Sequence, residues 1–150
     1  MIRLLDHKVE SEAISIRQVF QISYAIEAEL LQAKNFPPLK RPLADFIASN
    51  TSFYGFFEQE NLAAVIEVKN EENKIHIHSL VVAPTFFRRG IASKLLNFLF
   101  SEFDAQLFIV ETGAANGPAI SLYERHGFKL VKKWMTEIGI EKVAFERKVN

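Results

Sequence analysis

The stretch LVVAPTFFRRGIASKLL, residues 80–96, decides the fold of this chain. It starts as a short apolar run rich in β-branched residues, which is typical of a strand, and Pro84 ends that run. From Ile91 onward apolar side chains recur at helical spacing, which predicts a helix with one buried face. The stretch therefore predicts a strand, a basic turn that contains Gly90, and a helix.

This turn concentrates positive charge where a helix begins. Arg88, Arg89 and Lys94 lie in it or beside it, although the free N–H groups and partial positive charge of a helix start disfavour cations there. A bound anion would reverse that penalty, because N–H groups and arginines would converge on it. The alternative interpretation is a solvated basic turn that binds nothing.

The segment 82–96 resembles the acetyl-CoA motif of the GCN5-related N-acetyltransferases, whose pattern is Gln/Arg-x-x-Gly-x-Gly/Ala. Gly90 and Ala92 fill the last two positions, whereas Phe87 departs from the first. Arg88 or Arg89 would compensate for that departure. The resemblance implies that the turn holds the CoA pyrophosphate and that the preceding strand edge pairs with the pantetheine arm. The turn residues concerned are Phe87, Arg88, Arg89, Gly90, Ile91, Ala92, Ser93 and Lys94. The strand residues are Leu80, Val81 and Val82.

A second stretch, NGPAISLYERHGF at residues 116–128, has the residues that typically start and end a short helix. Asn116 or Gly117 caps its start, Pro118 suits its first turn, and Gly127 suits a left-handed residue after its end. Tyr123 falls on the apolar face of this helix, so the simplest interpretation is an ordinary core residue.

The same stretch also resembles the second CoA motif of that family, Asn-x-x-Ala-x-x-Leu-Tyr-x-x-x-Gly-Phe, with every position filled. The resemblance implies that Ala119 lies against the cofactor and that Asn116 contacts the cofactor or an ordered water. It also implies that Tyr123 protonates the leaving CoA thiolate.

Acetyl transfer to an amine needs a base, because neutralising an amine with a pKa of about 10.4 costs roughly 4–5 kcal/mol at pH 7. His76 and His78 lie two apart on a predicted strand and so share a face, and imidazole titrates near neutral pH. The pair matches the histidines of the family's arylalkylamine N-acetyltransferases; cross-strand packing or surface histidines are the alternatives. Glu111, at the end of a buried strand, is a reserve base or orients the substrate.

The N-terminal region is expected to cover the acceptor site, as the family resemblance implies. Tyr24, Glu27 and Phe36 are the candidate acceptor contacts there. Glu27 would pair with a cationic amine, although an exposed helix acid is the simpler interpretation. A metal site is not expected, because two histidines on one strand lack a local third ligand and the chain contains no cysteine.

The order of patterns predicts an α/β (α+β) fold in a single domain over residues 1–150, which is also the family's fold. We expect a central twisted mixed sheet of about seven strands flanked by about four helices. Expected helices are 9–34, 43–49, 91–103 and 118–126, with an irregular proline-rich loop at 35–42. Expected strands are 2–5, 53–58, 62–69, 74–82, 106–111, 128–136 and 141–148, of which 106–111 is a parallel strand buried on both faces.

Composition excludes several classes of protein. Eighteen basic residues balance 18 acidic ones, so no global field attracts nucleic acid or an anionic membrane. Fourteen phenylalanines argue for a packed core. No signal peptide or membrane span is apparent, so a cytoplasmic protein is expected, and a homodimer is compatible with these features.

We therefore expect an N-acetyltransferase that uses acetyl-CoA as co-substrate and transfers its acetyl group by direct attack of a primary amine, since no cysteine is present to form an acyl-enzyme. A small-molecule acceptor is the first interpretation. The alternatives are a protein or peptide acetyltransferase, a catalytically silent CoA-binding module, and a nucleotide binder.

Overall fold

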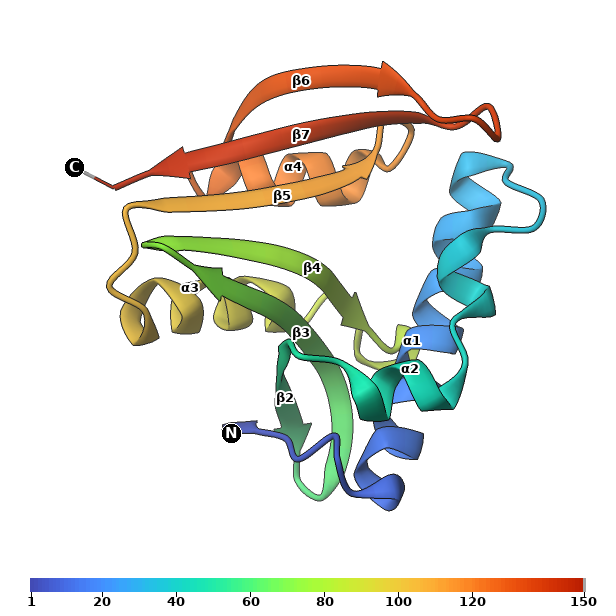
Figure 1. The fold of residues 1–150 in the computed structure, drawn as a ribbon, viewed down its shortest axis with the longest axis vertical. Coiled ribbons are helices and arrows are strands. Elements are labelled where there is room, and N and C mark those ends of the chain that lie inside the picture. Colours follow the sequence, from blue (N-terminus) through green and yellow to red (C-terminus); the bar gives the residue numbers. More distant parts are fainter. Residues whose placement is uncertain (150) are drawn as a thin grey trace.

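One mixed sheet organises the computed structural model, which describes residues 1–149 (Figure 1). Its strand order is β1-β2-β3-β4-β5-β7-β6, and β4–β5 is the parallel pair among antiparallel ones. The described residues form seven strands and four α-helices, as the sequence predicts. The strands are β1 (Ile2–Leu4), β2 (Ser52–Glu58), β3 (Asn61–Glu71), β4 (Lys74–Val82), β5 (Leu107–Gly113), β6 (Lys129–Met135) and β7 (Glu141–Lys148).

The helices cover the two faces of this sheet. They are α1 (Glu10–Leu31), α2 (Leu43–Ala48), α3 (Ile91–Glu102) and α4 (Gly117–Arg125). The helices α3 and α4 bury their apolar faces on one side of the sheet, and α1 and α2 bury theirs on the other. The strand β3 serves both cores, because Ile66 packs in the first and Val65 in the second.

A β-bulge in β4 changes which face its side chains occupy. Glu67 pairs with Ser79, but the next residue of β3 pairs with Ile77, so His78 has no partner on β3. Ile77 therefore packs with α3, whereas Val81 packs with α1. Residues four apart on a regular strand share a face, and the extra residue reverses that relation.

Beyond the bulge, β4 and β5 separate. Their parallel pairing covers residues 74–77 and 107–110 and then ends. Residues 78–82 of β4 keep their partners on β3 but have none on β5. In Figure 1 the two strands diverge toward the side where α1 lies, so the sheet opens at its centre.

Three expectations about the elements need correction. The first helix ends at Leu31 and not near residue 34, because Gln32 adopts a left-handed conformation with φ of 52°. The proline-rich loop is not wholly irregular: Pro37–Lys40 form a 3-10 helix, η1, since proline at its start presets the helical φ. A second such helix, η2 (Pro84–Phe86), follows β4.

The third correction concerns β5, which is buried on one face only. Phe108 and Val110 are buried, whereas Leu107 and Ile109 are half-buried and Glu111 is exposed. The reason is that α1 packs against β3 and β4 and leaves this face of β5 largely open.

No helix among residues 1–149 is both long enough and apolar enough to cross a bilayer.

Candidate active site

Two cavities meet where β4 and β5 separate. The gap cavity, about 700 Å³, lies between the diverging strands, the C-terminal half of α1, η1 and the β6–β7 turn. The turn cavity, about 600 Å³, lies between α1, the β4–α3 turn and α4. The residues that line both are Tyr24, Glu27, Leu80, Asn116, Ala119 and Tyr123.

The β4–α3 turn presents unpaired backbone donors to the turn cavity. Gly90 precedes α3 with a φ of +71°, and no side chain caps the helix. The first hydrogen bond of the helix runs from the N–H of Lys94 to the carbonyl of Gly90. The N–H groups of Ile91, Ala92 and Ser93 therefore have no helical partner. These three residues line the cavity, and such an uncapped helix start suits an anion.

The turn directs its basic side chains unequally. Arg88, at a φ of +65°, lines the turn cavity together with Phe87. Arg89 instead lies over the ring of Phe86, with 5.3 Å between Cζ and the ring centroid. Lys94 points toward β2, with its Nζ 5.5 Å from the Phe56 ring centroid. Neither Arg89 nor Lys94 lines the cavity. Of the three basic residues of this turn, Arg88 therefore lines it.

The β4 edge supplies a second set of backbone groups. Leu80, Val81 and Val82 line the turn cavity, on the side of β4 that β5 leaves unpaired. An extended ligand can therefore add to this edge as a strand would.

Helix α4 begins as its sequence predicts. The Oδ1 of Asn116 accepts the N–H of Ala119 over 3.3 Å, and Gly127 has a φ of +84° just beyond the helix end. The Nδ2 of Asn116 donates to Glu27 over 2.6 Å. One side chain thus caps α4 and ties it to α1.

Tyr123 lies at the junction of the two cavities. Its ring packs against Phe128 and Phe145, with centroids 5.5 and 6.3 Å away. Its hydroxyl forms no hydrogen bond with any described residue, and burial raises the pKa of the phenol. Tyr123 therefore keeps its proton at neutral pH, with its hydroxyl available to a ligand.

The two histidines of β4 occupy different environments. Their rings lie 5.0 Å apart. His78, the bulged residue, lines the gap cavity and also a side cavity of about 350 Å³ next to Glu67. His76 lines none of these cavities. Burial lowers the pKa of His78, so its imidazole is neutral at pH 7.

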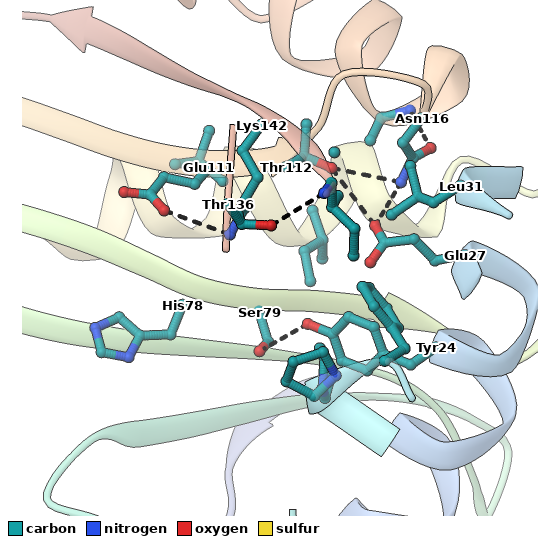
Figure 2. Close-up of a pocket in the computed structure, with 18 of the residues that line it drawn as sticks. Tyr24, Glu27, Leu31, His78, Ser79, Glu111, Thr112, Asn116, Thr136 and Lys142 are labelled. Carbon is teal, nitrogen blue, oxygen red and sulfur yellow. Dashed lines mark hydrogen bonds and ion pairs between the residues drawn. The ribbon is translucent and has the colours of Figure 1, made fainter. Parts of the chain in front are cut away.

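Carboxylates and a phenol from other elements complete the gap cavity (Figure 2). Burial raises the pKa of Glu27, whereas Glu111 lies 3.5 Å from the Nζ of Lys142 in an ion pair. The hydroxyl of Tyr24 donates to Ser79 over 3.0 Å, and burial raises the pKa of Tyr24 as well. Phe36 lines the cavity next to η1.

Sequence reasoning missed a buried ion pair behind the site. Arg41 donates to both carboxylate oxygens of Glu67, over 2.8 and 3.1 Å, and Thr51 donates to one of them over 2.7 Å. A signal for it exists in the sequence, because Glu67 is the one charge within the apolar run of residues 62–68. Ser79, Thr112 and the turn at 136–140 were also missed, and they have no local signal.

Among residues 1–149, no group of three or more His, Cys, Asp and Glu side chains is arranged to hold a metal ion.

Comparisons with known proteins identify the family and the fold. The model of the family described as "Acetyltransferase (GNAT) family" matches residues 16–128. The UPF0157 protein YqkA of Bacillus subtilis (strain 168) is 35% identical over 130 residues, which are 86% of this chain and 38% of that protein. The chain thus spans well under half the length of this relative.

Solved structures share the fold across the whole chain. The ribosomal-protein-S18-alanine N-acetyltransferase from Escherichia coli has a TM-score of 0.79 at 17% identity, covering 100% of this chain and 94% of that one. The PaiA N-acetyltransferase from Thermoplasma acidophilum, solved in complex with coenzyme A, has a TM-score of 0.73 at 17% identity, covering 99% of each chain.

Proposed function

Because this chain belongs to the acetyltransferase (GNAT) family, we propose that it transfers the acetyl group of acetyl-CoA to a primary amine of a small molecule. The observation that carries the proposal is the junction of the two cavities between β4 and β5, where six residues line both. Two ligands that enter from opposite sides would meet there, as direct transfer in a ternary complex requires.

The turn cavity is the proposed acetyl-CoA site. The free amides of residues 91–93 and the Arg88 side chain would hold the pyrophosphate. The unpaired edge at residues 80–82 would bind the pantetheine arm by backbone hydrogen bonds. When bound, acetyl-CoA supplies an activated thioester at the junction.

The gap cavity is the proposed acceptor site. The amine nitrogen attacks the thioester carbonyl, the carbon–sulfur bond breaks, and the products are an N-acetylamine and free CoA. His78, neutral because of its lowered pKa, takes the amine proton directly or through one water. Tyr123 donates its hydroxyl proton to the departing sulfur and is reprotonated from solvent. Glu111, paired with Lys142, is the reserve base.

A small acceptor is favoured because two distant chain segments cover the gap cavity. Phe36, Pro37 and Pro38 line it on one side, and residues of the 136–140 turn line it on the other. The cavity volume of about 700 Å³ is typical of small-molecule sites. Acetylation of a lysine or of a peptide N-terminus is the alternative acceptor chemistry.

Release of CoA from acetyl-CoA, followed with a thiol reagent, tests the proposal directly. The acceptors would be pools of polyamines, arylalkylamines, amino acids, aminoglycosides and lysine peptides, and the protein adds no thiol background because it has no cysteine. We expect release with one small-molecule pool. Release with peptides alone would overturn the acceptor class, and acetyl-CoA binding without release from any pool would indicate a silent CoA-binding module.

A further inference from the structure

The Glu27 carboxylate lies inside the site and forms no ion pair within residues 1–149, although the charge of Lys142 acts on it from a longer distance. Asn116 donates to its Oε1 over 2.6 Å and Thr112 over 3.5 Å. Within residues 1–149 its Oε2 accepts no hydrogen bond, and no ion pair involves Glu27. The Oε2 atom is accessible to solvent, because every buried side-chain oxygen of the described residues has a hydrogen-bond partner. Glu27 therefore offers one open carboxylate oxygen at the junction of the cavities.

Most other charges of the gap cavity are compensated. Lys142 pairs with Glu111 over 3.5 Å, and Arg41 pairs with the buried Glu67. His78 stays neutral at pH 7 because burial lowers its pKa. Glu137 also lines the cavity, but its side chain is exposed to solvent at the rim. Among the described residues that line the interior of the cavity, Glu27 is thus the acidic side chain without an ion-pair partner.

Much of the remaining lining is apolar. This apolar part comes from the end of α1, the segment that leads into η1, and the β6–β7 turn, and consists of Leu31, Phe36, Pro37, Pro38, Ile138 and Ile140. Figure 2 shows Glu27 beside Asn116 and Thr112 on one side of the gap, with Tyr24 and Ser79 on the other. A ligand that fills this space would place one cationic end at Glu27 and an uncharged body against the apolar walls.

We propose that the acceptor is a primary amine with a single positive charge on an apolar body, whose ammonium group binds the Oε2 of Glu27 before it loses its proton. This inference rests on the proposed acetyltransferase function and names its substrate class. Polyamines and aminoglycosides fit less well, because their further ammonium and hydroxyl groups would lose water against the apolar part of the lining.

The test compares kcat/KM for 2-phenylethylamine and hexylamine with that for spermidine, kanamycin and a lysine peptide. We expect the two apolar amines to exceed the others at least ten-fold. In Glu27→Gln, KM for both should rise at least ten-fold while the Kd for acetyl-CoA stays within two-fold. Glu29→Gln is the matched control, because Glu29 is exposed on the same helix and lines none of the cavities.

Glutamine separates the charge of Glu27 from its structural role. Its amide oxygen still accepts the hydrogen bonds of Asn116 and Thr112, so the fold is retained. Burial raises the pKa of Glu27, which means that the charged form opposes folding above the ordinary glutamate pKa of about 4.3. Glu27→Gln should therefore melt no lower than the wild type at pH 7. As a direct readout of charge recognition, trimethyl(2-phenylethyl)ammonium should inhibit the wild type competitively and Glu27→Gln at least ten-fold more weakly.

The outcomes separate this inference from the proposed function. Transfer that favours spermidine, kanamycin or the peptide, or a Glu27→Gln variant with unchanged KM, would overturn the acceptor class and leave the acetyltransferase intact. If no amine is acetylated, calorimetry on CoA-loaded protein measures whether 2-phenylethylamine binds. Charge-dependent binding of 2-phenylethylamine would support the acceptor class and overturn the enzyme, whereas no binding would overturn both.

Discussion

Tyr123 combines a structural role with the chemical role that we propose for it. Its ring belongs to the core shared by α3 and α4, and its hydroxyl lies at the junction of the two cavities. The two interpretations offered by the sequence, core residue and proton donor, therefore do not exclude each other. Burial serves both, because it packs the ring and keeps the phenol protonated.

Replacing Tyr123 with phenylalanine should lower kcat ten-fold or more and leave the Kd for acetyl-CoA near that of the wild type. The ring contacts with Phe128 and Phe145 are retained, so only the donated proton is lost. Steady-state kinetics and calorimetry measure the two quantities. Unchanged turnover would remove Tyr123 from the mechanism.

The pH dependence of kcat should report on His78. Burial lowers the pKa of His78, so its neutral, basic form persists below the ordinary histidine value of about 6.5. With saturating amine we expect kcat to stay constant from pH 8 down to that value and to fall at lower pH as the ring gains a proton.

His78→Gln should lower kcat and abolish this acidic decline. His76→Gln is the matched control, because His76 is the strand neighbour that lines no cavity. A decline that is unchanged in His78→Gln but absent from Glu111→Gln would assign the base to Glu111.

At the scale of elements, the β4–α3 turn depends on the backbone of Gly90. Its φ of +71° is costly for any residue with a Cβ, by about 1–2 kcal/mol. A Cβ there would meet no protein atom within 4 Å, so it would project into open space beside the turn cavity that Gly90 lines.

Gly90→Ala and Gly139→Ala form a matched pair for this turn. Gly139 has a φ of +80° and equally open surroundings, but it lies in the β6–β7 turn. Both variants should lose about the same free energy of unfolding in urea titrations. Calorimetry should show at least ten-fold weaker acetyl-CoA binding for Gly90→Ala alone; equal binding by the two variants would argue against this turn as the pyrophosphate site.

The segment that carries η1 over the gap cavity is anchored by Arg41. This side chain pairs with Glu67 on β3 and lies 4.1 Å from the ring centroid of Phe46 in α2. In addition, Gln21 donates to the carbonyl of Leu39 and Arg17 to that of Arg41, both from α1. One wall of the gap cavity is thus attached to both the sheet and the first helix.

Arg41→Met should lower the free energy of unfolding by about 3 kcal/mol, because it leaves the buried Glu67 carboxylate without a cation. KM for the amine should rise as the η1 segment loosens, whereas the Kd for acetyl-CoA should change little. Chemical denaturation and kinetics measure these effects. Lys40→Met, at the exposed neighbouring position, should change neither the free energy of unfolding nor the KM for the amine. If this control lost as much stability as Arg41→Met, the loss of a surface charge would explain both variants.

For the whole molecule, the important feature is a sheet in two parts. Strands β1–β4 and β5–β7 are joined through residues 74–77 and 107–110, and the two parts diverge beyond that seam. A ligand that bonds to β4 and also contacts α4, which follows β5, would connect the parts across the opening.

Acetyl-CoA at 100 times its Kd should stabilise the protein by about 2.7 kcal/mol, which corresponds to roughly 5–10 °C in Tm. Hydrogen exchange should slow at residues 80–82 and 91–93 and at the start of α4. CoA should act similarly, and ATP at the same concentration should protect the β4 edge less, since it lacks the pantetheine arm. Equal protection by ATP would support the nucleotide-binding alternative.

Much of this protein can be predicted from its sequence, because the signals are local. The strand–turn–helix at 80–96 and the capped helix at 116–128 follow from apolar periodicity, Pro84, Asn116 and Gly127. The parallel β4–β5 pair follows from the helix between the strands. These features, together with the match to the family motifs, are enough for the fold and the family.

Tertiary structure alone decided how the gap cavity is built. The bulge at His78 depends on how β4 pairs with β3, so the sequence pattern predicts His76 and His78 as equivalent while the fold exposes only His78 to the cavities. The contact between Glu27 and Asn116 joins residues 89 positions apart, and that between Arg41 and Glu67 joins residues 26 apart. Such pairings depend on how α1 and η1 cross the sheet, and packing sets those crossings because no local preference of the chain encodes them.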